Sequence, residues 1–325
     1  MNIVFVGDVM LGRLANAALK VEPPAYPWGD TLPIFSGGDV RMCNLECVIS
    51  DRGTPWSRTP KVFHFRSDAK NMAALQRAQI DMVSLANNHT LDFDYEAMLD
   101  MLHLLDQAKI RHAGAGRQAL EASRVASAHV HGARIGLVAF TDNEPEWAAT
   151  DRSPGLFYVP INVADRRAKR LFDIVGRAKG EVDLLIVSAH WGPNWGYSPP
   201  ANHPPFAKAL IEAGADLIFG HSGHVFRGIE LYQQRPIVYC TGNFIDDYAV
   251  DEIERNDQSF IFVAETEKNQ IRTLKLYPTV IRNCQARLAS SPEREDIVQK
   301  MQHLCAQLHT KASWQKDDAL TVEIG

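Results

Sequence analysis

The chain has 325 residues, of which 46% are hydrophobic and 22% are charged, and its formal net charge at pH 7 is −5. This composition supports a large buried core and excludes the disordered and collagen-like classes. The lysines and arginines are scattered along the sequence rather than clustered, so we expect no nucleic-acid partner.

Strand and helix signals alternate in the first third of the chain. Apolar, β-branched runs predict buried strands, and apolar residues at helical spacing predict helices. The predicted strands are 3–6, 40–43, 61–66 and 82–86, the third as an edge or lid strand, and the predicted helices are 14–20, 68–78 and 94–107. This rhythm is typical of βαβ units.

The middle of the chain continues the alternation, and the last third departs from it. A hairpin is predicted from 125–129 and 134–140, and helices 165–178 and 204–213 each lead into a buried strand. Four strands with short connections then follow, at 228–232, 236–241, 259–266 and 271–279. They predict a second, mostly antiparallel sheet, before an amphipathic helix at 293–308 and a flexible tail.

Two further features concern the cellular location. The chain contains no run of about 18 apolar residues, and its beginning lacks the basic start and apolar core of a secretory signal. Its five cysteines are odd in number and have no CxxC spacing, which is typical of reduced thiols. These features predict a cytoplasmic protein without a membrane segment.

Five predicted strands end in side chains that bind metals or transfer protons. These side chains are Asp8, Glu46, Asn88 with His89, His190, and His221 with His224. Because open α/β sheets bind ligands at the carboxyl ends of their strands, we expect these groups to meet along one edge of a sheet.

The same segments resemble a known family, the CapA or poly-γ-glutamate synthesis proteins within the calcineurin-like metallophosphoesterases. The resemblance covers roughly residues 1–250, and its motifs are Gly7-Asp8-Val9-Met10, Asn44-Leu45-Glu46, Asn87-Asn88-His89, Ala189-His190-Trp191, Gly220-His221-Ser222-Gly223-His224 and Thr241-Gly242-Asn243. It implies a four-layer α/β/β/α sandwich, in which two mixed sheets are flanked by helices. We expect this domain at 1–283 and a C-terminal helix and tail at 284–325.

The resemblance also implies one or two divalent metal ions, with Mn, Zn, Fe and Mg as candidates. Carried over by motif, the ligands are Asp8 and His224 on one ion, Asn88, His190 and His221 on the other, and Glu46 between them. Such a pair makes bound water a nucleophile and clamps the reacting phosphorus. His89 would donate a proton to the leaving oxygen. Asp92 and Asn243 would orient the first ligands or form turns.

The sequence departs from the family pattern at three positions. Phosphoesterases usually bridge the two metals with an aspartate, and the longer Glu46 in its place would change the metal spacing or act as a free acid or base. Metallophosphoesterases usually carry a histidine where this chain has Met10, and many CapA relatives carry one in place of Ser222. A thioether is a poor ligand for a hard or borderline dication, so the first metal site lacks one ligand.

Three functions therefore remain open. The first is a metal-dependent hydrolase acting on a phosphate ester or on a γ-glutamyl or peptide-like carboxylate substrate. The second is a metal-free acid/base enzyme that moves a Cα proton with Glu46, His89, His190 and His224. The third is a noncatalytic accessory protein of poly-γ-glutamate or capsule metabolism.

The substrate expected for either enzyme is a small or peptide-like anion. Arg13 and Lys61 are predicted to bind it, because guanidinium and ammonium groups pair with carboxylate and phosphate. Trp191 and Trp195 lie in a proline-rich loop directly after His190. This loop predicts either a wall of the substrate site or a local hydrophobic cap.

Overall fold

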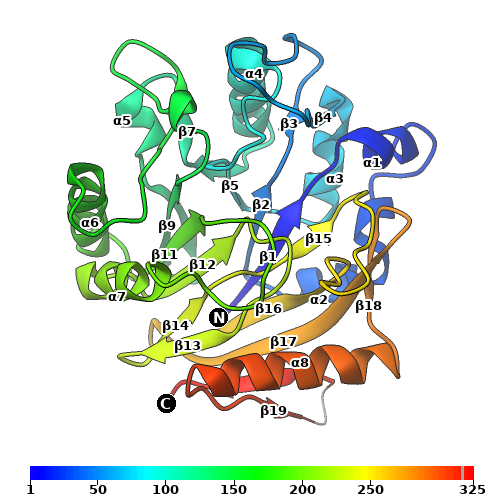
Figure 1. Cartoon of the computed structure of the whole chain (residues 1–325), viewed down its shortest axis with the longest axis vertical. Coiled ribbons are helices and arrows are strands. Elements are labelled where there is room, and N and C mark those ends of the chain that lie inside the picture. The colour runs from blue at the N-terminus through cyan, green and yellow to red at the C-terminus, as the bar shows by residue number, and fades with distance from the viewer. Residues whose placement is uncertain (316–317) are drawn as a thin grey trace.

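The larger of two mixed sheets contains ten strands (Figure 1). The structure is a computed structural model that describes residues 1–315 and 318–325. The ten strands are β1 (Asn2–Val9), β2 (Val40–Leu45), β5 (Met82–Ser84), β6 (Arg111–Ala113), β15 (Asn243–Ile245), β16 (Gln258–Glu267), β17 (Gln270–Arg282), β18 (Gln285–Leu288), β19 (Ser313–Trp314) and β20 (Leu320–Glu323). Eight of them follow the order β19-β20-β17-β16-β1-β2-β5-β6, while β15 pairs with β1 and β18 with β17.

The second sheet has six strands in the order β13-β14-β12-β11-β9-β8. They are β8 (Ala126–Val130), β9 (Ala133–Thr141), β11 (Leu184–His190), β12 (Leu217–His221), β13 (Ile229–Tyr232) and β14 (Arg235–Val238). Strands β9, β11 and β12 are parallel, so their carboxyl ends share one edge. Two small pairs join β3 (Val48–Ile49) to β4 (Arg66–Ser67) and β7 (Ala115–Gly116) to β10 (Gly155–Leu156).

Helices flank both sheets, and the last of them packs into the apolar cluster between the two sheets. They are α1 (Arg13–Ala18), α2 (Leu32–Ser36), α3 (Met72–Arg77), α4 (Asp94–Gln107), α5 (Ala119–Ala122), α6 (Arg166–Lys179), α7 (His203–Ala213) and α8 (Glu293–Gln307), with short 3-10 turns at Tyr26–Thr31, Ala69–Asn71 and Pro145–Trp147. Among the described residues, no helix combines the length and the apolar content that crossing a bilayer requires.

Apolar clusters lie between the sheets and helices, and side chains along β1 point alternately into two of these clusters. Val4 and Val6 face a cluster shared with α3 and α4, whereas Ile3 and Phe5 face the six-stranded sheet. The Phe5 ring lies 5.3 Å from that of Phe219 on β12. A third cluster lies between the six-stranded sheet and helices α6 and α7. The prediction of two mixed sheets flanked by helices is confirmed.

The predicted partition of the late strands is wrong. Strands β13 and β14 extend the six-stranded sheet through β12, whereas β16 and β17 join the larger sheet through β1. The four strands therefore do not form a sheet of their own. Alternation of apolar residues identifies a strand, but its partner is set by long-range packing.

Two further predictions of secondary structure are also wrong. The segment 61–66 was predicted as a strand, but it is irregular up to Arg66. Its apolar side chains Val62 and Phe63 are exposed and do not pack on a sheet. In the tail, which was predicted to be flexible, β20 pairs with β17 because Leu320 and Val322 complete the core. The helix predicted at 68–78 is a 3-10 turn followed by α3.

Candidate metal centre and its cavity

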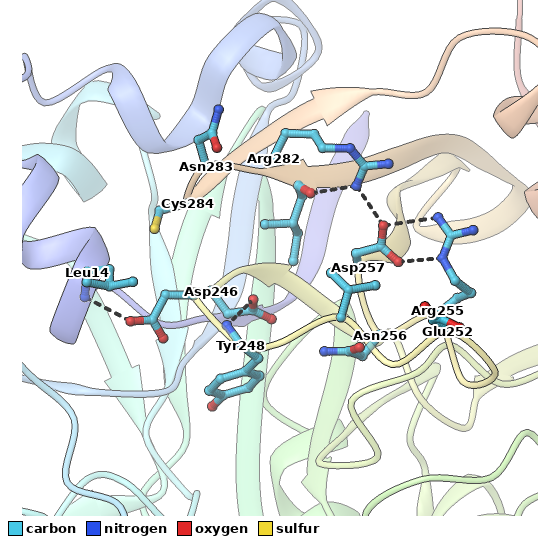
Figure 2. A pocket seen from close by; sticks show the side chains of 13 residues that line it. Leu14, Asp246, Tyr248, Glu252, Arg255, Asn256, Asp257, Arg282, Asn283 and Cys284 are labelled. Atoms are coloured by element: carbon cyan, nitrogen blue, oxygen red, sulfur yellow. Dashed lines mark hydrogen bonds and ion pairs between the residues drawn. The ribbon is translucent and has the colours of Figure 1, made fainter.

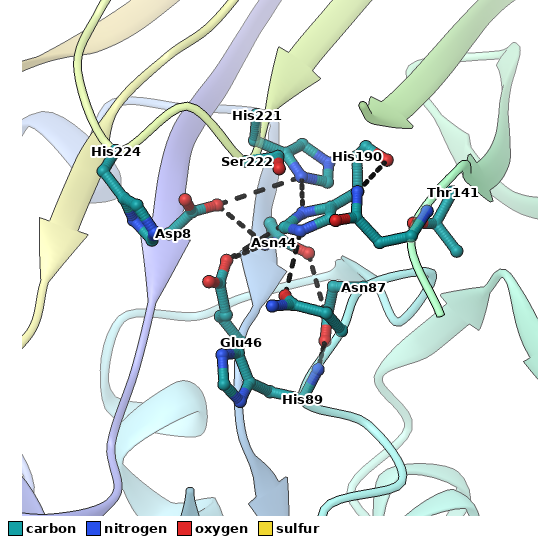
Figure 3. Close-up of polar contacts among 12 residues, drawn as sticks. Asp8, Asn44, Glu46, Asn87, His89, Thr141, His190, His221, Ser222 and His224 are labelled. Carbon is teal, nitrogen blue, oxygen red and sulfur yellow. Dashed lines mark hydrogen bonds and ion pairs between the residues drawn. The ribbon is translucent and has the colours of Figure 1, made fainter. Parts of the chain in front are cut away.

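The polar strand ends converge where the carboxyl edges of the two sheets meet (Figure 3). Asp8 belongs to β1 in the larger sheet, while His190 and His221 end β11 and β12 in the other and are direct neighbours in register. The groups therefore come from two sheet edges rather than from one. A glycine is required at position 7, because a Cβ there would overlap the carbonyl oxygen of Gly242.

Asp8, His190 and His221 form the first group of potential metal ligands. The Nδ1 atoms of the two histidines lie 2.7 Å apart, and the Nδ1 atom of His221 is 3.9 Å from Oδ1 of Asp8. The Ser188 hydroxyl lies 2.7 Å from Nε2 of His221, which holds the ring with Nδ1 toward Asp8. On the other side, Nε2 of His190 is 3.0 Å from Oδ1 of Asn88.

Asp8 also belongs to a second group, with Glu46 and His224. The amide of Asn44 donates to both carboxylates, at 2.7 Å to Asp8 and 2.8 Å to Glu46. Nδ1 of His224 lies 3.0 Å from Oδ1 of Asn243, which leaves Nε2 of that ring for a ligand. The carboxylate common to both groups is therefore Asp8, whereas the family motif suggested that Glu46 lies between the ions.

Burial controls the protonation of these groups. It raises the pKa of Asp8, and burial together with the charge of Asp8 raises the pKa of Glu46 well above its usual range. It also lowers the pKa of His221 to about 3 and that of His190 well below its ordinary value, which His221 lowers further. The imidazoles are therefore neutral and offer lone pairs, as metal ligation requires.

The donors present fit a divalent cation. Oδ2 of Asp8 is buried and has no hydrogen-bond partner among the described residues, and such a group is costly without a counter-charge. Imidazole nitrogens combined with carboxylate oxygens suit Zn²⁺, Fe²⁺ or Mn²⁺. The sulfur of Met10 accepts a hydrogen bond from the backbone N–H of Gly12 at 3.1 Å, so it is directed at its own turn.

The turn that carries the last histidine is strained. Ser222 has a φ of 98° and His224 a φ of 58°, a region that non-glycine residues rarely occupy. Arg13, Glu144 and Trp195, which border the same site, also have positive φ. Strain of this kind persists only where the surrounding structure imposes it, and it concentrates at functional sites.

His89 is held by a carboxylate behind it. Its Nδ1 lies 2.6 Å from Oδ2 of Asp92, and its ring stacks on Phe65 at 4.0 Å between centroids. Because a carboxylate only accepts, Nδ1 carries the proton and Nε2 remains for a substrate. Burial lowers the pKa of His89, and Asp92 partly offsets this effect. The resting ring is therefore neutral.

A cavity of about 600 Å³ opens above His89, and both predicted anion binders line it. The ammonium of Lys61 is already engaged, at 2.7 Å from the carbonyl oxygen of Asn88, 3.2 Å from Glu144 and 3.4 Å from Asp92. Lys61 therefore fastens the loop at residues 58–65 to the site rather than offering a free charge.

Arg13 is the more accessible cation of the cavity. Its side chain is 37% exposed and pairs with Asp247 at 3.1 Å. The guanidinium also lies over the rings of Phe65 and Tyr248, at 5.3 and 5.9 Å from their centroids. The pair is bidentate and the side chain of Asp247 is fully buried, so the carboxylate holds Arg13 in place, and an incoming anion can reach the exposed part of the guanidinium.

Trp191, predicted as a substrate contact, lies in the core instead. It is fully buried, stacks on His203 at 4.5 Å and donates its indole N–H to the carbonyl oxygen of Tyr239. The second tryptophan of the loop, Trp195, lines the cavity and is 41% exposed. Its ring lies 5.6 Å from that of His224.

Three polar residues of the site were given no role from the sequence. Asn44 bridges the two carboxylates, Asn87 donates to Asn44 at 2.9 Å, and Ser188 holds His221. Asn44 and Asn87 each stand beside a predicted ligand, in the same short motif. Ser188 shares a face of β11 with His190, because side chains two apart on a strand point the same way. A buried hydroxyl beside a ligand was thus the available signal.

A second pocket of about 680 Å³ adjoins the cavity and shares Tyr248 with it (Figure 2). One wall is an ion network in which Asp257 accepts from Arg255 and Arg282 at 2.6–3.0 Å. Asp246 lies behind Tyr248, and burial raises the pKa of its carboxyl to about 8. Glu293 also accepts from both arginines, so ion pairs brace this wall of the pocket.

Residues 2–248 match the family model described as bacterial capsule synthesis protein PGA_cap. A probable polyglutamine synthesis accessory protein from Mycobacterium tuberculosis is 31% identical over 97% of this chain and 86% of its own length. The capsule biosynthesis protein CapA of Bacillus anthracis is 28% identical over 76% of this chain, which spans 60% of that relative.

Solved structures show more distant similarity. A hypothetical protein from Thermus thermophilus aligns with a TM-score of 0.49 and 15% identity, covering 86% of this chain and 98% of the other. A second structure from the same organism, TT1561, aligns with a TM-score of 0.40 and 13% identity, over 80% of this chain and 92% of its own.

Proposed function

This chain belongs to the PGA_cap family of bacterial capsule synthesis proteins. We propose that it is a metal-dependent hydrolase of poly-γ-glutamate or capsule metabolism. Its substrate is a phosphate ester or a γ-glutamyl or peptide-like carboxylate. One observation carries the proposal, which is that two groups of potential ligands, Asp8–His190–His221 and Asp8–Glu46–His224, share one buried carboxylate.

The residues of these two groups would hold one or two divalent cations. When bound, such cations lower the pKa of a water molecule and stabilise negative charge on the reacting group. The chain prepares the ligands itself, because Asn44 fixes both carboxylates while Ser188 and Asn243 fix the rings of His221 and His224. Groups held in this way lose little entropy when an ion binds.

His89 and Asp92 act on protons. The neutral ring of His89 accepts a proton at Nε2, and the Asp92 carboxylate stabilises the imidazolium that forms. The same imidazolium then donates the proton to the leaving oxygen or nitrogen. The stacked ring of Phe65 keeps water from one face of His89.

Arg13 positions the anionic part of the substrate. A planar guanidinium binds carboxylate and phosphate bidentately, which suits both substrate classes. Trp195 and Tyr248 border the cavity on the sides of His224, at 5.6 and 5.3 Å between ring centroids. These rings restrict water around the reacting bond.

Metal content is the first test. Tag-free protein is analysed for metals as purified and after incubation with Mn²⁺, Zn²⁺ or Fe²⁺, beside Asp8→Ala, His190→Ala and a control, His112→Gln. His112 is also buried and paired with a carboxylate, but it lies outside both ligand groups. We expect about one or two ions per chain, lost in the two site variants and kept in the control. Wild-type protein that binds none of the three metals would falsify the proposal.

A second test identifies the reaction. Metal-loaded protein is assayed on an aryl phosphate and on a γ-glutamyl anilide, each beside His89→Ala. Loss of a general acid/base typically lowers turnover by about 10²–10⁴-fold. Deuterium uptake at a substrate Cα in D₂O, insensitive to chelator, points instead to the metal-free proton-transfer enzyme.

A noncatalytic accessory role is the second candidate. It is favoured by the name of the mycobacterial relative, a probable accessory protein, and by Met10, whose sulfur is engaged by Gly12. Metal binding without turnover on broad phosphate and peptide panels would support this role over hydrolysis.

A further inference from the structure

Helix α6 presents an unusually basic outer face. Its sequence contains six basic residues and a single acidic one, Asp173. The apolar residues of the helix, among them Leu171 and Val175, are buried against the six-stranded sheet. The cations are therefore directed outward, although the protein as a whole carries a net charge of −5.

A groove of about 740 Å³ runs between this face and helix α5. Four arginines line it, namely Arg117, Arg124, Arg170 and Arg177, and so do two acidic residues, Glu121 and Glu181, which leaves an excess of positive charge. Only Arg117 has an ion pair with a described residue, Glu121, at 2.8 Å. The cations are scattered along the sequence, and folding collects these four from segments about 50 residues apart.

The spacing of the arginines fits a chain of anions better than one small anion. Arg170 and Arg177 are seven residues apart on one helix, which places them about 10 Å apart along its axis. Arg124 lies on the opposite side of the groove, after α5. Guanidinium groups at such intervals can each pair with a separate carboxylate of an extended polymer.

Two other polyanionic partners fit the groove less well. A bilayer is flat and is usually bound by protruding apolar anchors, whereas this surface is concave and has one strongly exposed apolar residue at its border, Leu120. Single-stranded nucleic acid is held largely by stacking of bases on aromatic rings, and no described residue lining the groove is aromatic.

The groove begins on the same side of the sheet as the candidate metal centre. Helix α6 follows β9 and precedes β11, and both strands are parallel and end at that edge. The N-terminal end of α6 is therefore nearer the site than its C-terminal end, and Arg170 precedes Arg177 along the helix.

We infer that the α5–α6 groove is a binding site for a polycarboxylate chain. The site is distinct from the metal centre and holds the polymer along the flank of the six-stranded sheet. The choice of a glutamate polymer as its ligand rests on the proposed function, because it assumes that the chain acts in poly-γ-glutamate metabolism.

The test measures binding of fluorescently labelled poly-γ-glutamate by anisotropy. Arg170→Glu/Arg177→Glu reverses two groove cations, and Arg170→Gln/Arg177→Gln only neutralises them. Arg77→Glu/Arg287→Glu, at exposed positions on α3 and β18, makes the same change in net charge elsewhere. We expect the reversal to weaken binding at least about 10-fold and the neutralisation less, with the control within about 2-fold of wild type.

Equal losses in the groove variant and the control would overturn the inference, because they would reflect net charge alone. Binding to vesicles with anionic phospholipid, or to single-stranded DNA, without binding to the polymer would overturn it as well. Binding of the polymer but not of glutamate supports it. Hydrolysis is scored separately on the small substrates, so failure of the metal centre and failure of the groove give different results.

Discussion

Asp92 joins three parts of the site through one side chain. Its Oδ2 accepts a hydrogen bond from the backbone N–H of Phe65 and lies 2.6 Å from Nδ1 of His89. Its Oδ1 is 3.4 Å from the ammonium of Lys61. A single buried carboxylate therefore orients the ring of His89, the proposed acid/base group, and fixes the loop above it.

Asp92→Asn should lower the pKa of His89. A carboxylate favours the protonated ring, and an amide of the same size removes that charge while retaining a hydrogen-bonding group. The measurement is an NMR titration of the His89 ring protons. Asp106→Asn is the control, because Asp106 also pairs with a histidine, His112 at 3.3 Å, but lies outside the site, so the His89 titration should not change in this variant. An unchanged His89 titration in Asp92→Asn would show that the pair does not set its proton affinity.

Glu46 should destabilise the metal-free protein as the pH rises. Its folded pKa is raised, mainly by burial and then by Asp8, above its ordinary value of 4.5. The stability it contributes is therefore present below that value and is lost as the pH rises through the folded pKa. Cations bound at the proposed centre would remove this penalty, because they stabilise the ionised carboxylate.

Glu46→Gln should therefore be more stable than wild type without metal, by about 0.5–2 kcal/mol, with the difference growing between pH 5 and 9. Urea unfolding in the presence of a chelator measures this difference in unfolding free energy. Glu181→Gln, at an exposed position, makes the same change in net charge and is the control. Added Mn²⁺ should stabilise wild type more than the variant. A variant less stable than wild type across this range contradicts the prediction.

Among the structural elements, the loop that carries Trp195 depends on an arginine behind it. Arg227 is 1% exposed and forms no ion pair with a described residue. It donates to the carbonyl oxygens of Gly196, Pro193 and Trp195 at 2.9, 3.2 and 3.0 Å. Its guanidinium also packs on Gly223, where a Cβ would lie 2.9 Å from Nη2.

Arg227→Met should loosen this loop at a cost of about 2–4 kcal/mol, because three carbonyl groups lose a charged donor. Arg227→Lys should keep part of the loop's protection from hydrogen exchange, since an ammonium can still reach some of the carbonyl oxygens. Hydrogen exchange of residues 192–197 measures the effect, and the 94–107 helix serves as an internal reference. Equal protection of the loop in wild type and Arg227→Met would refute the role given to Arg227.

Sequence patterns predicted where helices and strands lie better than they predicted which strands pair with each other. The helices at α4, α6, α7 and α8 and the hairpin of β8 and β9 were predicted to within a few residues. Their periodicity is a local property. Whether a late strand joined β1 or β12 depended on contacts between residues far apart in sequence, and alternation carries no information about that choice.

For the whole molecule, short motifs at strand ends predicted which distant residues meet, whereas hydrophobic patterns did not. Strand ends placed Asp8, Glu46, His190 and His221 together because their strands are buried and end at neighbouring edges. The sequence could not tell that Trp191 fills the core while Trp195 borders the cavity, since both follow the same strand. It also could not show that the arginines of α5 and α6 share one groove, because that depends on how two helices pack.

The last strand tests how far global stability and the site are independent. In β20, Leu320 is fully buried opposite Leu276, and two strands separate β20 from β1 and Asp8. Leu320→Ala should cost about 2–5 kcal/mol in unfolding free energy through the cavity it leaves. The exposed neighbour Glu323→Ala should cost less than about 0.5 kcal/mol. At temperatures below their unfolding transition, both variants should bind as much metal as wild type, because none of the proposed ligands lies on β20. A loss of metal binding in folded Leu320→Ala would mean that the two sheets position the site together, as one cooperative unit.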